Sequence, residues 1–231
     1  MCGIIGYVGR EKAAPILLDG LARMEYRGYD SAGVAVRSEE HGLQVKKSKG
    51  RLQVLSDMIH GGADLEGCLG IGHTRWATHG EPNDINAHPH VSENGAIALV
   101  HNGIIENYLE IKEHLQKLGV VFTSDTDSEV VAQLLEYHYN ECHSMLEAVG
   151  RCLRRIEGSY ALGIICADYP NALIAARKDS PLILGFGEDG NYLASDVTAI
   201  IKHTRDVAYM DDGEIAVLTA DSIDVFDDEL V

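Results

Sequence analysis

The chain has 231 residues, 45% of them hydrophobic, which suits one globular domain, or two small ones, with a sizeable core. Its 19 lysine and arginine residues against 36 aspartate and glutamate residues leave a formal charge of −17 at pH 7. Because binding to phosphate groups needs basic patches, this composition argues against nucleic acid and anionic membranes as partners.

Apolar periodicity and turn residues predict strands toward both ends of the chain and helices in its middle. In chain order, the expected elements are a strand at 2–8, a helix at 13–26, paired strands at 31–36 and 43–47, a short helix at 52–59, strands at 69–75 and 96–101, helices at 108–118, 128–139 and 144–156, and strands at 160–167, 172–177, 182–185, 207–210, 214–218 and 223–226. The pattern favours an α+β fold in which two sheets pack face to face with helices outside, as one domain over 1–231.

The start of the chain places a cysteine directly after the initiator methionine. Removal of Met1 would leave Cys2 with both a thiol and a free α-amine. The thiolate is the nucleophilic form, and an α-amine with a pKa of about 7.7 to 8.0 is partly neutral near pH 7 and can accept a proton. One residue would then supply a nucleophile and its base. Taken alone, position 2 is equally well an arbitrary residue.

The densest polar cluster runs from Gly72 to Gly80, where a strand enters the long loop 76–94. A loop of this length is typical of binding or lid segments. Arg75 could hold a carboxylate through two parallel hydrogen bonds, Thr78 could add a hydroxyl contact, and Trp76 could cover a pocket. The structural alternative is a surface arginine and a core tryptophan.

A second cluster, His101-Asn102-Gly103, follows the strand at 96–101. An asparagine amide beside a glycine N–H offers two donors that can form an oxyanion hole, although a plain Asn-Gly turn is the alternative. In the acidic segment 124–129, Thr126 or Asp127 could cap the following helix, or one carboxylate could bind a substrate ammonium group.

The histidines of this region raise the question of a metal site: His73, His79, His88, His90 and His101. No H-E-x-x-H motif or acidic ligand at a recognisable spacing accompanies them, so we expect no metal and no cofactor. The five cysteines include no C-x-x-C pair, and Cys68 and the three later ones are expected to be buried and inert. No leader and no long apolar run is evident, which predicts a reduced, cytoplasmic protein that does not span a membrane.

Together these motifs resemble the class II glutamine amidotransferases, and within them the glutaminase domain of the glutamine–fructose-6-phosphate aminotransferases. The strings that carry the resemblance are Met1 to Ile4, Tyr26 to Gly33, Gly72 to Gly80, Asn86 to His90 and His101 to Asn107. The resemblance implies an N-terminal nucleophile fold, a four-layer α/β/β/α sandwich that hydrolyses L-glutamine to glutamate and ammonia through a γ-glutamyl thioester. In the full-length family enzyme, a homodimer, C-terminal sugar isomerase domains would use the ammonia to convert fructose-6-phosphate to glucosamine-6-phosphate.

The resemblance also implies catalytic roles. Cys2 would attack the glutamine side-chain amide, and its own α-amine would shuttle the proton. Asn102 and the N–H of Gly103 would stabilise the oxyanion. Arg27 and Gly28 would lie near the Cys2 terminus and orient it.

The remaining roles concern the substrate. Arg75 would grip the α-carboxylate of glutamine with help from Thr78 and His79. Asp127 would pair with the α-ammonium, and Trp76 would sit in the loop that closes over the substrate.

Three alternatives stay open at this point. The chain could belong to another class II amidotransferase, such as amidophosphoribosyltransferase, with the same glutaminase chemistry and a different acceptor. It could be an N-terminal nucleophile hydrolase of other amides. It could also be a non-catalytic domain that binds a metal or ligand through His88 and His90.

Overall fold

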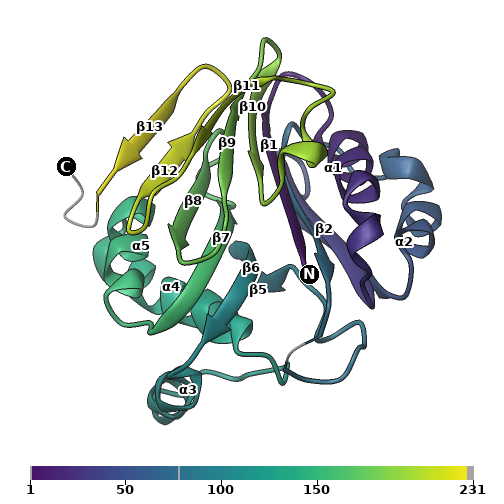
Figure 1. Cartoon of the computed structure of the whole chain (residues 1–231). Helices are drawn as coiled ribbons and strands as arrows, with labels where there is room; N and C mark the ends of the chain where they lie inside the picture. The colour runs from purple at the N-terminus through teal and green to yellow at the C-terminus, as the bar shows by residue number, and fades with distance from the viewer. Residues whose placement is uncertain (1, 78, 228–231) are drawn as a thin grey trace.

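The computed structural model describes residues 2–77 and 79–227. Two antiparallel sheets pack face to face, and helices cover the outer face of each (Figure 1). The first sheet has the order β11-β9-β10-β1-β4-β2-β3, with β1 at Gly3–Gly9, β2 at Ser31–Ser38, β3 at Gly42–Lys49, β4 at Leu69–Arg75, β9 at Ile183–Phe186, β10 at Gly190–Ala194 and β11 at Asp206–Tyr209. The second sheet has the order β13-β12-β8-β7-β6-β5, with β5 at His90–Val91, β6 at Ile97–Ile105, β7 at Gly158–Cys166, β8 at Leu173–Lys178, β12 at Ile215–Leu218 and β13 at Ile223–Phe226.

The helices divide between the two outer faces. Those packed on the first sheet are α1 (Ala13–Arg23) and α2 (Leu52–Met58). The second sheet carries α4 (Ser128–Cys142) and α5 (Met145–Leu153), with α3 (Tyr108–Lys117) against α4. Single 3₁₀ turns complete the described elements: η1 (Glu25–Arg27), η2 (His60–Gly62) and η3 (Val197–Ala199). None of the helices in the described ranges has the length and apolar character of a membrane span.

The predicted two-sheet sandwich is therefore confirmed, but individual strands differ from expectation. The sequence reading missed β10, a five-residue strand that lies between β9 and β1 in the first sheet. It also missed β5, the two-residue strand inside the long loop. The strand expected to end at residue 101 continues to Ile105, because β7 supplies a partner along its whole length.

One prediction about the cysteines is wrong. Cys152 and Cys166 are buried, but Cys68 is exposed and Cys142 is half-buried. Cys68 lies just before β4, at the end of its pairing with β1, and its thiol is at the surface.

Side chains of the central strands alternate between two apolar layers, as the period of a strand requires. Ile4 of β1 and Ile71 of β4 face the second sheet and pack with Val100 of β6. Ile5 points to the opposite face and packs with Leu17 of α1. A residue two positions before or after one of these on the same strand therefore also points between the sheets. On this periodicity Cys2, His73 and Asn102 meet at one end of the inter-sheet layer.

The long loop 76–94 is fastened to the first sheet by a lysine. The Nζ of Lys47 on β3 donates to the backbone oxygens of Ile85 and Ala87, at 2.9 Å each, and of Pro89 at 3.4 Å. Burial lowers the pKa of Lys47 to about 8. Gly33 on β2 allows the close approach, because a Cβ there would lie 2.1 Å from the backbone oxygen of His88.

Lys47→Met is expected to destabilise the protein, because it leaves loop carbonyls without their donor. The expected loss is about 1–3 kcal/mol of unfolding free energy, which lowers Tm by about 2–4 °C per kcal/mol in a chain of this size. Thermal denaturation measures it. The matched control is Lys46→Met, at the exposed neighbouring position. Equal Tm values for the two variants would show that the lysine does not hold the loop.

Candidate active site

A pocket of about 430 Å³ opens at the end of the inter-sheet layer where β1 begins. Its lining brings together residues far apart in sequence, among them Cys2, Arg75, Trp76, His79, Asn102, Gly103 and Asp127. These are predicted site residues, and they come from the N-terminal segment, the end of β4 and the loop after it, β6, and the start of α4. Thr78 and the side chain of Arg27 lie outside what the structure describes.

The Cys2 thiol lies at the wall of this pocket. Its Sγ accepts a hydrogen bond from the N–H of Trp76 at 3.1 Å and lies 3.5 Å from the Trp76 backbone oxygen. Burial raises the pKa of the Cys2 thiol, and the Trp76 N–H opposes that rise. A thiol in this environment is protonated near pH 7 and needs a base before it can attack.

Asn102 lies inside β6 and does not form a turn, so the Asn-Gly turn alternative is excluded. Its Nδ2 donates to the Cys2 backbone oxygen at 3.2 Å, and its Oδ1 pairs with His73 Nε2 at 2.9 Å. The neighbouring Gly103 has φ of +133°, and a Cβ there would lie 2.1 Å from the backbone oxygen of Ser159. Only glycine fits this point of the strand.

Arg75 is buried, with 4% of its surface exposed. Its Nη2 donates to the backbone oxygens of His79 and Gly80, the latter at 3.2 Å. Its Nη1 is buried and has no hydrogen-bond partner within the described residues. A buried guanidinium donor left unpaired in a pocket wall suits a carboxylate ligand.

Asp127 supplies a carboxylate to the same pocket. Its Oδ2 accepts from the Ile105 N–H at 2.8 Å, and its Oδ1 lies 3.9 Å from Nδ1 of His79. The first turn of α4 is capped by Thr126, whose hydroxyl accepts from the Glu129 N–H at 3.3 Å, and the Asp127 side chain makes no capping bond. The Asp127 carboxylate therefore does not cap α4.

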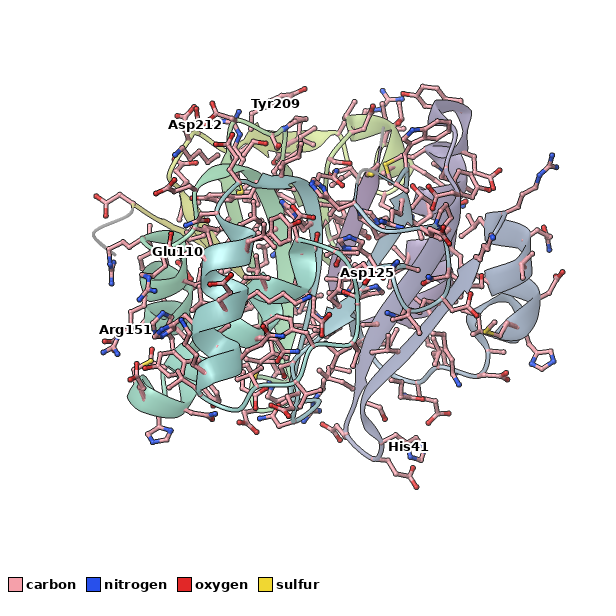
Figure 2. All side chains as sticks on the ribbon, turned by 90° about the horizontal axis from the view of Figure 1, so that it is seen from below. His41, Glu110, Asp125, Arg151, Tyr209 and Asp212 are labelled. Carbon is pink, nitrogen blue, oxygen red and sulfur yellow. The ribbon has the colours of Figure 1, made fainter. Side chains whose placement is uncertain are left out.

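Asp125, the other aspartate of this segment, is exposed and does not line the pocket. Its backbone N–H donates to Asn86 Oδ1 at 3.0 Å, which ties the segment before α4 to the long loop. Figure 2, a view from below, shows Asp125 between the helix that carries Glu110 and the hairpin that ends at His41. The geometry thus distinguishes the two aspartates and favours Asp127 as the ligand.

Gly28 and Trp76 meet at the mouth of the pocket. Trp76 is 56% exposed, and a Cβ on Gly28 would lie 3.0 Å from its ring. Gly28 has φ of +72°, which glycine adopts without strain. The glycine therefore leaves space for the tryptophan ring, a contact that the sequence reading did not assign to it.

Three buried histidines, His73, His88 and His90, lie at or beside the pocket wall, and His88 lines the pocket itself. The sequence reading gave them no role beyond a possible metal site. The ring centroids of His73 and His88 are 4.2 Å apart, and those of His88 and His90 are 4.6 Å apart. Burial lowers the pKa of His73 to about 3 and lowers those of His88 and His90 as well, so all three rings are neutral. The described ranges contain no group of three or more His, Cys, Asp or Glu side chains arranged to hold a metal ion.

Asp30 is a further residue whose role the sequence reading missed. Its Oδ2 accepts from the Ala77 N–H at 2.5 Å, and its backbone N–H donates to the Arg75 oxygen at 2.7 Å. It thereby fixes the backbone on both sides of Trp76, whose N–H contacts the Cys2 thiol. The sequence did contain a signal for Asp30, because this residue belongs to the motif from Tyr26 to Gly33.

Comparison with known proteins gives consistent results. A family model described as a glutamine amidotransferase domain matches residues 73–202. Proteins named glutamine–fructose-6-phosphate aminotransferase (isomerizing) from Caldanaerobacter subterraneus subsp. tengcongensis and Clostridium tetani are 56% and 50% identical over 98% and 99% of the chain. The chain spans 37% of the length of each of these relatives.

Solved structures agree on the fold. The glutamine phosphoribosylpyrophosphate amidotransferase of B. subtilis superposes with a TM-score of 0.83 at 25% identity, over 98% of this chain and 49% of that one. A protein described as the allosteric regulatory enzyme of purine biosynthesis gives a TM-score of 0.86 at 26% identity over the same shares. Both carry the sandwich described above within a longer chain.

Proposed function

The chain belongs to the glutamine amidotransferase domain family, and from this premise we propose that it hydrolyses L-glutamine to glutamate and ammonia through a thioester on Cys2. The observation that carries the proposal is the convergence of three groups in one pocket. They are the thiol of Cys2, the side-chain amide donor of Asn102 and the unpaired guanidinium donor of Arg75.

The first half of the reaction forms the thioester. Once Met1 is removed, the α-amine of Cys2 accepts the thiol proton and the thiolate attacks the side-chain carbonyl carbon of glutamine. The resulting oxyanion is stabilised by Nδ2 of Asn102 and by the N–H of Gly103. The protonated α-amine of Cys2 then gives its proton to the leaving nitrogen of the substrate amide. The C–N bond breaks and ammonia departs. In the second half, water attacks the thioester under the same base, which releases glutamate and the thiol.

Substrate recognition uses opposite charges at the two α-groups of glutamine. We infer that Arg75 Nη1 binds the α-carboxylate and that Asp127 binds the α-ammonium. Both side chains are buried, so each bond to a charged group forms in a poorly hydrated environment, where it is strong. His79 and Thr78 would complete the carboxylate site, and Trp76 would cover the bound substrate. Roles for Arg27 and Gly28 in orienting the Cys2 terminus stay predictions.

Because the named relatives are longer than this chain, the fate of the ammonia is a further part of the proposal. We infer that in a full-length cytoplasmic enzyme it is passed to sugar isomerase domains that convert fructose-6-phosphate to glucosamine-6-phosphate, within a homodimer. The relatives that support this acceptor, at 56% identity, are far more similar to the chain than the phosphoribosylpyrophosphate amidotransferase is, at 25% identity. The phosphoribosyl acceptor is therefore the less supported alternative.

The direct test is release of glutamate from L-glutamine by protein whose intact mass shows that Met1 has been removed. We expect turnover from this protein and none from protein that retains Met1, because the retained residue blocks the α-amine. Absence of turnover with a confirmed free Cys2 terminus would contradict the proposal for this chain.

Asp127→Asn is expected to raise KM for glutamine by roughly 10-fold or more, since a hydrogen bond between charged groups contributes about 1.5–3 kcal/mol. The asparagine oxygen can still accept from the Ile105 N–H, so the backbone bond is retained. Initial-rate kinetics with glutamine measure the change. The matched control is Asp125→Asn, two residues away at an exposed position, with KM unchanged. Equal KM values in both variants would remove Asp127 from the ammonium site.

A further inference from the structure

The side-chain amide of Asn102 is oriented by two contacts of opposite kind. One partner is the Cys2 backbone oxygen, at 3.2 Å, which can only accept a hydrogen bond. The Asn102 atom that faces it must therefore be the nitrogen. It follows that the amide oxygen faces Nε2 of His73, at 2.9 Å, and that this ring nitrogen carries the proton and donates.

We propose that His73 is a positioning residue that locks the Asn102 amide with Nδ2, and not Oδ1, toward the reacting centre at Cys2. The proposal rests on the proposed function, because it assigns a role in stabilising the oxyanion. The orientation matters because the two ends of an amide have opposite polarity. A rotated amide would present a lone pair to the oxyanion in place of a donor.

The His73 ring is itself held on several sides. It sits on β4, where His73 is paired with Ile4 of β1 and with Gly33 of β2. The ring stacks on His88 at an interplanar angle of 24°. Nδ1 of His88 in turn accepts from the His101 N–H at 3.3 Å, on β6. The donor thus reaches Asn102 from the first sheet, while its stacking partner is anchored to the second.

Of the two contacts on the amide, the one from His73 is the shorter and the better shielded. The His73 side chain is fully buried, whereas Cys2 is partly exposed at the pocket wall. Burial also keeps the ring neutral near pH 7, since it lowers the His73 pKa to about 3. A neutral imidazole has one N–H group, and in His73 this group donates a hydrogen bond to Oδ1 of Asn102.

The test compares His73→Gln with His73→Met, two side chains of similar length and volume of which only glutamine can donate to Asn102. We expect His73→Met to lower kcat for glutamine hydrolysis roughly 10- to 100-fold with little change in KM, a smaller loss than removal of the oxyanion donor itself. His73→Gln should recover most of the activity. Thermal denaturation shows whether both variants are folded, and His138→Met, at a buried histidine on α4, controls for loss of a buried ring.

A double-mutant cycle adds a criterion that a merely structural role would not meet. In an Asn102→Ala background the difference in kcat between His73→Gln and His73→Met should vanish, because there is no amide to orient. Equal kcat values in the two single variants, or a difference that persists without Asn102, would overturn the proposal.

A measurement without turnover separates this proposal from the proposed function. In nitrogen-15 histidine-labelled protein, the His73 signals, assigned by their absence in His73→Gln, should show the proton on Nε2 and an unprotonated Nδ1. The opposite tautomer would overturn the positioning role even in a protein that hydrolyses glutamine. An Nε2–H tautomer in a Met1-free protein that does not hydrolyse glutamine would contradict the proposed function and support the contact.

Discussion

Cys2→Ala is expected to reduce glutamine hydrolysis to the uncatalysed background, a loss of roughly 10⁴-fold or more, as when the nucleophile of other covalent hydrolases is removed. The methyl group cannot form the thioester, and no other thiol lines the pocket within the described residues. Glutamate release measures the loss. Mass spectrometry during turnover should also show a γ-glutamyl adduct on the unsubstituted protein and none on the variant.

The matched control is Cys68→Ala, which removes an exposed thiol that does not line the active-site pocket and should leave kcat unchanged. The Cys2→Ala variant should fold normally, because Cys2 precedes β1 and is not part of the hydrogen-bonded ladder of that strand. Retained turnover in folded Cys2→Ala would mean that the reaction proceeds without the thioester, and the mechanism would be wrong.

Asn102→Ala is expected to lower kcat by roughly 10²–10³-fold with little change in KM, the effect of removing one oxyanion donor. The donor acts on charge that develops only in the transition state, so binding of the neutral ground-state amide loses little. Asn102→Asp should be at least as impaired, because it has nearly the same shape and places a negative charge beside the oxyanion. Steady-state kinetics on both variants measure these effects.

Asn191→Ala is the control for this pair. Asn191 is a buried strand asparagine on β10 whose Nδ2 donates to the backbone oxygens of Thr219 and Ser222, so its loss should lower Tm and leave kcat unchanged. If Asn102→Ala raised KM and left kcat unchanged, Asn102 would be assigned to substrate binding. The N–H of Gly103 would then remain as the proposed oxyanion donor.

The parts of the fold predicted correctly are those with a local pattern. Helices such as α1 and α4 show an apolar stripe, and strands such as β7 show an apolar run, so these elements could be predicted from the chain alone. The missed strand β10 has only five residues and begins at Gly190. Its strand conformation depends on pairing with β1 and β9, which a sequence window does not contain.

The candidate site, too, could be predicted from the sequence only in part. Cys2, Arg75, Asn102 and Asp127 stood out because each side chain has a chemistry suited to glutamine hydrolysis and lies in a motif. The choice between Asp127 and Asp125 rested on resemblance at that level. In the structure, only Asp127 of the two lines the pocket.

The sequence by itself predicted Cys2 as the nucleophile, and it determined the polar residues at the strand ends and the alternation that turns them toward one layer, since these depend on residue type and on the period of a strand. Only the tertiary structure decided that His73 donates to Asn102 and that Lys47 fastens the long loop. These contacts join segments 29 and 38 residues apart. Their distances depend on how the two sheets stack and on the register of the strands, which are properties of the whole fold.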